Sequence, residues 1–183
     1  MLIQFAGMMP AVPESCFVAG SAELIGDITL GESVNIWYGT VIRGDINTIV
    51  IGDNTNIQDG SVIHVDTPSD KEGSGSVKIG RNVTVGHKAL IHACKIGDNC
   101  LIGMGAIILS GAEIGDGCIL GAGAVVRENE IIPPGSLVVG LPAKVKGQVS
   151  GEWHQKILAS ASKYVELGQK HKQLASLPVI KHS

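Results

Sequence analysis

The chain has 183 residues and a formal net charge of −3 without a basic cluster, so nucleic acid is not the expected partner. Apolar residues make up 44% of the chain but aromatic residues only 3%, so the core must consist mainly of aliphatic side chains. No segment reaches the roughly 18 apolar residues of a membrane-spanning helix, so no membrane association is expected. Met1 to Pro10 lack the features of a secretion signal, and we predict a cytoplasmic location.

Aliphatic residues recur at every sixth position through most of the chain, with three interruptions. A period of six matches neither the 3.6-residue repeat of a helix nor the two-residue alternation of a strand. It predicts a coil of three short strands, each with one inward aliphatic side chain, so that about 18 residues close one turn. The series comprises Val12, Val18, Leu24, Leu30, Ile36 and Ile42, then Ile51, Ile57 and Ile63, then Ile79, Val85 and Ile91, and finally Ile96, Ile102, Ile108, Ile114, Leu120, Val126, Ile132 and Val138.

Stacked turns of this kind would enclose a column of aliphatic side chains, which accounts for the scarcity of aromatic residues. A β-sandwich with regular turns is the alternative, but it would not keep a strict period of six over the whole run from Ile96 to Val138. The pattern resembles the hexapeptide repeat, and this resemblance implies a left-handed parallel β-helix. General crossover rules favour the right hand, so the handedness depends on the resemblance alone. We therefore predict an all-β fold, with a β-helix domain over residues 1–149.

A helical pattern replaces the six-residue period near the end of the chain. The apolar positions at helical spacing include Trp153, Ile157, Ala161 and Tyr164. Ser150 precedes them and is a favourable N-cap residue. We predict a C-terminal α-helix over residues 150–175 that packs along the β-helix, followed by a loose tail at 176–183.

The three interruptions of the repeat are candidate sites of function, because insertions into a repeat commonly carry it. Three extra residues lie within Ile42–Ile51, and about ten lie within Ile63–Ile79. The second insertion includes Asp66–Ser76, a polar segment rich in Gly and Ser that predicts an exposed loop. The third interruption is a step of five residues within Ile91–Ile96.

Three histidines lie beside these interruptions. His64 and His92 each directly follow an inward aliphatic residue, and their separation of 28 residues equals one turn plus the ten-residue insertion. They should therefore stack on the same outer face. His87 lies two residues after Val85, on the preceding strand, so one chain is not expected to bring it to the other two. A neighbouring subunit could supply it to a three-histidine metal site. Three unrelated surface histidines are the alternative.

Four segments extend this pattern to a known family. They are Arg43-Gly44-Asp45, Asn56-Ile57-Gln58-Asp59-Gly60, Ile63-His64, and Val85-Gly86-His87 followed five residues on by His92. Together they resemble the gamma-class carbonic anhydrases and their bacterial homologues of ferripyochelin-binding and carnitine-operon type. The resemblance implies a homotrimer that catalyses the reversible hydration of CO2 to bicarbonate. It also implies one Zn²⁺ per interface, held by His64 and His92 of one subunit and His87 of the next, with Fe²⁺ or Co²⁺ as the alternative metals.

The same resemblance assigns roles to five further residues. Gln58 would orient the reacting water or bicarbonate, and Tyr164 would cap the pocket. Arg43, Asp45 and Asp59 would form a charged cluster near the metal. A salt-bridge network that only assembles the trimer is an equally open reading of those three residues, and packing of the helix is an equally open reading of Tyr164.

One departure from the family concerns proton transfer. The founding enzymes carry an acidic loop with a glutamate shuttle, whereas Ile46–Val50 of this chain contains no carboxylate. Hydration should therefore be slow or depend on buffer. Two alternatives remain: an acyl-CoA acyltransferase or thioesterase, and a non-catalytic trimeric scaffold that carries a metal. The acyltransferases typically use one catalytic histidine, so three converging histidines argue against the first.

Overall fold

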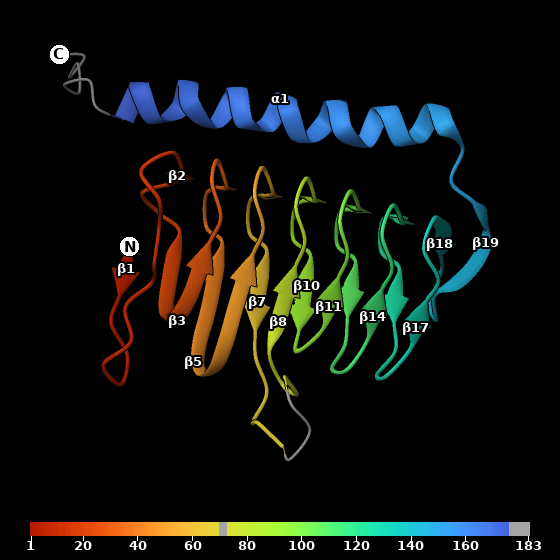
Figure 1. Ribbon diagram of the computed structural model, residues 1–183, viewed down its shortest axis with the longest axis horizontal. Coiled ribbons are helices and arrows are strands. Elements are labelled where there is room, and N and C mark those ends of the chain that lie inside the picture. The colour runs from red at the N-terminus through yellow and green to blue at the C-terminus, as the bar shows by residue number, and fades with distance from the viewer. Residues whose placement is uncertain (70–72, 176–183) are drawn as a thin grey trace, which may run out of the picture.

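The chain winds into a parallel β-helix, and one long helix lies along it, as the computed structural model in Figure 1 shows. This confirms the predicted fold of hexapeptide repeats with a C-terminal α-helix. The structure describes residues 1–69 and 73–175, and the predicted tail at 176–183 lies outside them.

The strands form three faces, which we number in chain order. The first face contains β2 (Phe17–Val18), β4 (Asn35–Ile36), β6 (Asn56–Ile57), β9 (Thr84–Val85), β12 (Leu101–Ile102), β15 (Ile119–Leu120), β18 (Ser136–Val139) and the antiparallel β19 (Lys144–Gln148). The second face contains β1 (Leu2–Ile3), the first parts of β3 (Glu23–Leu30) and β5 (Val41–Ile51), β7 (Val62–His64), β10 (Leu90–His92), β13 (Ile107–Ile108) and β16 (Val125–Val126). The third face contains the later parts of β3 and β5, β8 (Val77–Ile79), β11 (Lys95–Ile96), β14 (Glu113–Ile114) and β17 (Ile131–Ile132).

Stacked aliphatic residues form the core. On the first face, Ile36, Ile57, Val85 and Ile102 pair in register and are fully buried. Each turn thus contributes one inward aliphatic residue per strand, as the period of six predicts. Because like residues stack on like, aliphatic side chains fill this column, and the buried rings of Phe17 and Trp37 lie outside the repeating positions.

All three interruptions of the repeat lie at one corner, between the second and third faces. The first falls within β5, where the pairing with β3 shifts by several residues. The second connects β7 to β8, and the third connects β10 to β11. Figure 1 shows the bend of β5 and the long loop after β7 projecting from the same edge. Insertions that are far apart in the sequence therefore gather where β7 and β10 end.

Helix α1 (Gly151–Ala175) covers part of the first face, where it contacts β2, β4, β6 and β9. Ser150 caps it, because Trp153 N donates a hydrogen bond of 3.4 Å to Ser150 Oγ. Ile157 and Ala161 are each 1% exposed, but Trp153 is 48% exposed. The expectation that Trp153 packs on the β-helix is therefore wrong: the buried side of α1 is centred on later residues, and Lys156 covers the indole instead. Within the described ranges, no helix is long and apolar enough to cross a membrane.

The contact between α1 and the first face is partly polar. Asn35 and Asn56 are buried there, and Asn35 Oδ1 accepts a hydrogen bond of 2.8 Å from Trp37 Nε1. Asn56 Nδ2 donates to Thr84 Oγ1 at 3.0 Å, and Thr84 Oγ1 lies 3.2 Å from Ser160 Oγ of α1. These bonds satisfy the buried groups and help to fix the position of the helix along the face.

Gly168 marks a close approach of α1 to the first face. A Cβ atom there would lie 3.0 Å from Asn35 Cβ and 3.3 Å from Phe17 Cβ. We expect Gly168→Leu to lower the free energy of unfolding by about 2 kcal/mol, because the helix must shift to admit the side chain. The exposed Lys170→Leu on the same helix is the control and should change it by less than about 0.5 kcal/mol. Denaturant titration measures both, and equal stability of the two variants would contradict the close packing.

Candidate metal centre

His64 and His92 lie side by side at the ends of β7 and β10. The two residues are paired in register, so each points outward from the same position of adjacent turns. His64 Nδ1 lies 3.3 Å from His92 Nε2, and the ring centroids are 5.2 Å apart. The stacking predicted from their separation in sequence is thus observed.

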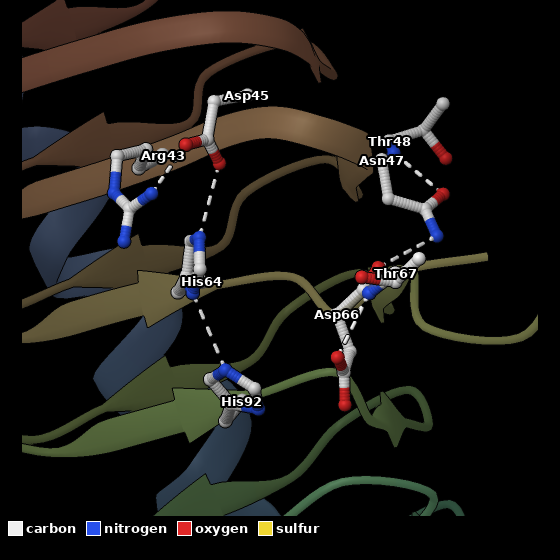
Figure 2. A network of polar contacts seen from close by, with 8 residues as sticks. All are labelled: Arg43, Asp45, Asn47, Thr48, His64, Asp66, Thr67 and His92. Atoms are coloured by element: carbon white, nitrogen blue, oxygen red, sulfur yellow. Dashed lines mark hydrogen bonds and ion pairs between the residues drawn. The ribbon is translucent and has the colours of Figure 1, made fainter.

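A carboxylate holds the outer nitrogen of His64. His64 Nε2 lies 3.0 Å from Asp45 Oδ1, and Asp45 also forms an ion pair with Arg43 (Figure 2). Burial of Asp45 works against ionisation, but the hydrogen bonds from His64 and Arg43 outweigh it and lower the pKa of the carboxyl group. An ionised Asp45 accepts a hydrogen bond from Nε2–H of His64, which leaves the lone pair of His64 on Nδ1, the atom that faces His92.

A hydroxyl group lies behind the second histidine. His92 Nδ1 is 2.9 Å from Ser110 Oγ, and Ser110 stands one turn later in the sequence. Burial lowers the pKa of His92, and the neighbouring His64 lowers it further. Both effects favour the neutral imidazole, which is the form that binds metal ions.

The facing nitrogens have the spacing of two ligands on one ion. Two nitrogens bound at about 2.05 Å to a tetrahedral zinc ion lie about 3.3 Å apart. His64 Nδ1 and His92 Nε2 are 3.3 Å apart. A divalent ion would also relieve the repulsion between two lone pairs that face each other. The pair therefore fits half of a metal site.

His87 lies at the opposite edge of the second face. It occupies the turn between β9 and β10, whereas His92 ends β10. His87 Nδ1 pairs with Asp59 Oδ2 at 2.9 Å, and both side chains are about two-fifths exposed, at 40% and 43%. A carboxylate behind Nδ1 leaves Nε2 of His87 free to face outward as a ligand.

Gln58 and Tyr164 lie at the same edge of the second face as His87. Gln58 is 4% exposed, and its Nε2 donates to Asn56 Oδ1 at 3.2 Å. Burial raises the pKa of Tyr164, the charge of Asp59 adds to this effect, and a hydrogen bond with Gln58 opposes it. Tyr164 also packs edge-on against Trp37, with 5.5 Å between ring centroids.

The eight residues predicted for the site thus form two groups. One edge of the second face carries Arg43, Asp45, His64 and His92, and the other carries Gln58, Asp59, His87 and Tyr164. Among the residues that the structure describes, no three His, Cys, Asp or Glu side chains of the chain are grouped so that they could hold a metal ion. We call these groups the His64/His92 half-site and the His87 half-site.

Sequence reasoning missed two residues beside the His64/His92 half-site. Ser110 lies beside His92, but counting does not predict it: the turn after His92 is one residue short, with Ile91 paired to Ile108, so the period indicates Leu109 as the neighbour. Asp66 begins the long loop after β7, and its Oδ2 lies 3.5 Å from Ser110 Oγ. No repeat spacing predicts the path of an insertion, so the position of Asp66 required the structure.

Known proteins share both the sequence and the fold. Residues 93–128 match the family described as bacterial transferase hexapeptide (six repeats). A carbonic anhydrase of Geobacillus kaustophilus is 39% identical over 174 residues, which cover 95% of this chain and 92% of that protein. The chain belongs to the gamma-class carbonic anhydrase family. Mitochondrial gamma carbonic anhydrase 2 of Arabidopsis thaliana is 41% identical over 88% of the chain, but the match spans only 58% of the plant protein.

Names within the family differ. A Bacillus cereus protein that is named as an acetyltransferase superposes with a TM-score of 0.88 and is 39% identical to this chain. The match covers 94% of this chain and 97% of the other. The fold therefore does not decide between the two chemistries, and the decision must come from the site.

Proposed function

We propose that the protein is a homotrimeric, metal-dependent carbonic anhydrase with three sites between subunits. His64 and His92 of one subunit and His87 of the next would bind Zn²⁺, and Fe²⁺ or Co²⁺ suit the same donors. The observation that carries the proposal is the pair of facing nitrogens 3.3 Å apart, with Asp45 and Ser110 behind them. The family relationship supports the same reaction, hydration of CO2.

An apolar stripe on the second face supports the trimer. Its residues pair in register from turn to turn and are Val41, Val62, Leu90, Ile107 and Val125. Val62 is 42% exposed and Leu90 38%. Helix α1 covers part of the first face, and the third face carries the charged side chains Lys78, Lys95 and Glu113. No described element of the chain covers the stripe, and such a patch is typical of a subunit interface.

The half-sites border this stripe on its two sides. Consider a trimer in which each subunit turns its second face toward a threefold axis. Each edge of one subunit's second face then meets the opposite edge of its neighbour's second face. A cyclic arrangement has no shift along its axis, so residues at one height in one subunit stay at that height in its neighbours. His87 and His92 flank the same strand, β10, and would therefore meet across the interface.

The residues of the chain would act mainly by positioning. A bound divalent ion supplies activation of water for attack on CO2. Asp45 and Asp59 hold His64 and His87 in the tautomers that leave one nitrogen free for the ion. Gln58, itself held by Asn56, would orient the water or the bicarbonate product by a hydrogen bond.

Metal analysis combined with a CO2-hydration assay tests the proposal. The purified protein should contain about one divalent ion per subunit. His64→Ala should lose both the metal and the activity, whereas His154→Ala, on α1, should keep both. A wild-type protein that neither binds a divalent ion nor hydrates CO2 after metal loading would refute the proposed function.

Proton transfer should limit the reaction. No glutamate lies within β5, where the three-residue insertion falls, and Ile46–Val50 contains no carboxylate. We expect the rate of CO2 hydration to be low and to rise severalfold with the concentration of imidazole buffer, because buffer must remove the proton. Stopped-flow measurements at constant ionic strength check this. A fast rate that does not change with buffer would contradict it.

The acyltransferase reading is tested in the same experiments. The Bacillus cereus neighbour bears an acetyltransferase name, so hydrolysis or transfer of an acyl group from acyl-CoA is the second candidate. Acyl-CoA turnover that survives removal of the metal would favour it. Metal binding without either activity would favour a non-catalytic trimer.

A further inference from the structure

The Ser110 hydroxyl lies between His92 and the Asp66 carboxylate. Ser110 Oγ is 2.9 Å from His92 Nδ1 and donates a hydrogen bond of 3.5 Å to Asp66 Oδ2. Because Ser110 Oγ is the donor in this bond, the hydroxyl proton lies on the side of Asp66. The oxygen of Ser110 is then free to accept from Nδ1–H of His92. The lone pair of His92 is left on Nε2, which is the atom that faces His64.

We infer that Ser110 and Asp66 are positioning residues that fix the tautomer and ring orientation of His92 for metal binding. The inference rests on the proposed metal site and extends it to two residues outside the ligand set. Ser110 contacts His92 at Nδ1, whereas Nε2 is the atom that would bind the ion, so Ser110 and Asp66 would act through His92. Orienting groups of this kind commonly change metal affinity by about 10- to 100-fold.

The two insertions serve the two histidines in parallel. Asp45 lies in the insertion within β5 and holds His64. Asp66 begins the insertion after β7 and reaches His92 through Ser110. Each of the two insertions thus places one carboxylate behind one member of the facing pair. This accounts for both insertions lying at the corner where β7 and β10 end.

Asn47 joins the two insertions and holds Asp66 in place. Its Nδ2 donates to the main-chain oxygens of Asp66 and Ser74, at 3.1 Å and 2.8 Å. Asp66 N also donates to Gly75 O at 2.7 Å, which closes the base of the loop. Figure 2 shows Asn47 and Asp66 on the same side of the His64/His92 pair. The backbone of Asp66 is therefore fixed from two sides, although its side chain is exposed.

The experiment is a Co²⁺ titration of the metal-free trimer, followed by visible absorption and by competition with a chelator. We expect Ser110→Ala and Asp66→Ala each to weaken Co²⁺ binding by about 10- to 100-fold. Ser110→Thr keeps the hydroxyl and should restore most of the affinity. Ser76→Ala is the matched control, because Ser76 Oγ donates a hydrogen bond of 2.7 Å to Gly73 O within the same loop. The melting temperature of the metal-free trimer should be unchanged in all four variants.

A double variant separates a relay from two independent effects. If Asp66 acts through Ser110, the Ser110→Ala/Asp66→Ala protein should bind Co²⁺ no more weakly than Ser110→Ala alone. Fully additive losses would overturn the relay. Wild-type affinity in Ser110→Ala would overturn the inference and leave the proposed function standing, whereas wild-type protein that binds no Co²⁺ would overturn both. A loss in Ser110→Ala that Ser110→Thr does not restore would assign Ser110 a packing role and also overturn the inference.

Discussion

Co-expressed His87→Ala and His64→Ala subunits should together recover about a quarter of the wild-type metal content, although neither variant binds metal alone. A mixed trimer contains one interface that joins an intact His64/His92 half-site to an intact His87 half-site. Cyclic symmetry permits one such interface whichever variant is in the majority, and about three-quarters of randomly assembled trimers are mixed. Metal content per subunit, measured on the purified mixture, is the readout.

The matched control combines His64→Ala with His92→Ala. Both residues belong to the same half-site, because they pair in register at the ends of β7 and β10. No interface of these mixed trimers is complete, so the metal content should stay near zero. Equal recovery in the two mixtures would show that His87 does not come from the neighbouring subunit. Mass spectrometry must first establish that both preparations contain mixed trimers.

Gly103→Ala should destabilise the β-helix strongly, by about 3 kcal/mol. A Cβ atom at Gly103 would lie 2.5 Å from Ala122 N and 2.7 Å from Leu120 O, both main-chain atoms of the next turn. The stacked turns are tied by hydrogen bonds such as Gly103 N to Leu120 O at 2.8 Å, so the backbone cannot withdraw without breaking them. Thermal or denaturant unfolding of the metal-free protein measures the effect.

Gly20→Ala is the control for this substitution. A Cβ atom there would meet nothing within 4 Å, so stability should change by less than about 0.5 kcal/mol. Both sites lie outside the two half-sites, and both variants add the same methyl group. If Gly103→Ala were as stable as Gly20→Ala, the spacing between turns would have to be more adaptable than the structure indicates.

Much of the fold and part of the site could be predicted by counting residues. Each uninterrupted turn adds one inward residue per strand at a constant interval, so the pairing of Ile102 with Leu120, 18 residues later, follows from the period alone. The same counting predicts that His64 and His92 stack, because residues one turn apart are paired in register. It also predicts that His87, with a different phase, lies elsewhere. These conclusions are local, since they depend only on spacing along the chain.

Other features depended on how elements pack, which spacing does not encode. Helix α1 covers the first face rather than the second, and this choice leaves the stripe with Val62 and Leu90 exposed. The same packing turns Trp153 away from the β-helix, where a helical pattern alone places it on the apolar side. A helix of this amphipathic pattern would suit several faces, and the buried contacts of Ile157 and Ala161 decide which one it takes.

The sequence by itself determined the turns of this protein and which histidines stack, because both follow from a strict interval of six residues. Only the tertiary structure decided which side chains contact the outer ring nitrogens of those histidines. Asp45 and Asp66 lie in segments that depart from the interval, and the path of such segments depends on tertiary hydrogen bonds such as those of Asn47. The carboxylates that orient the candidate ligands therefore become visible only when the insertions are seen to fold back onto one corner.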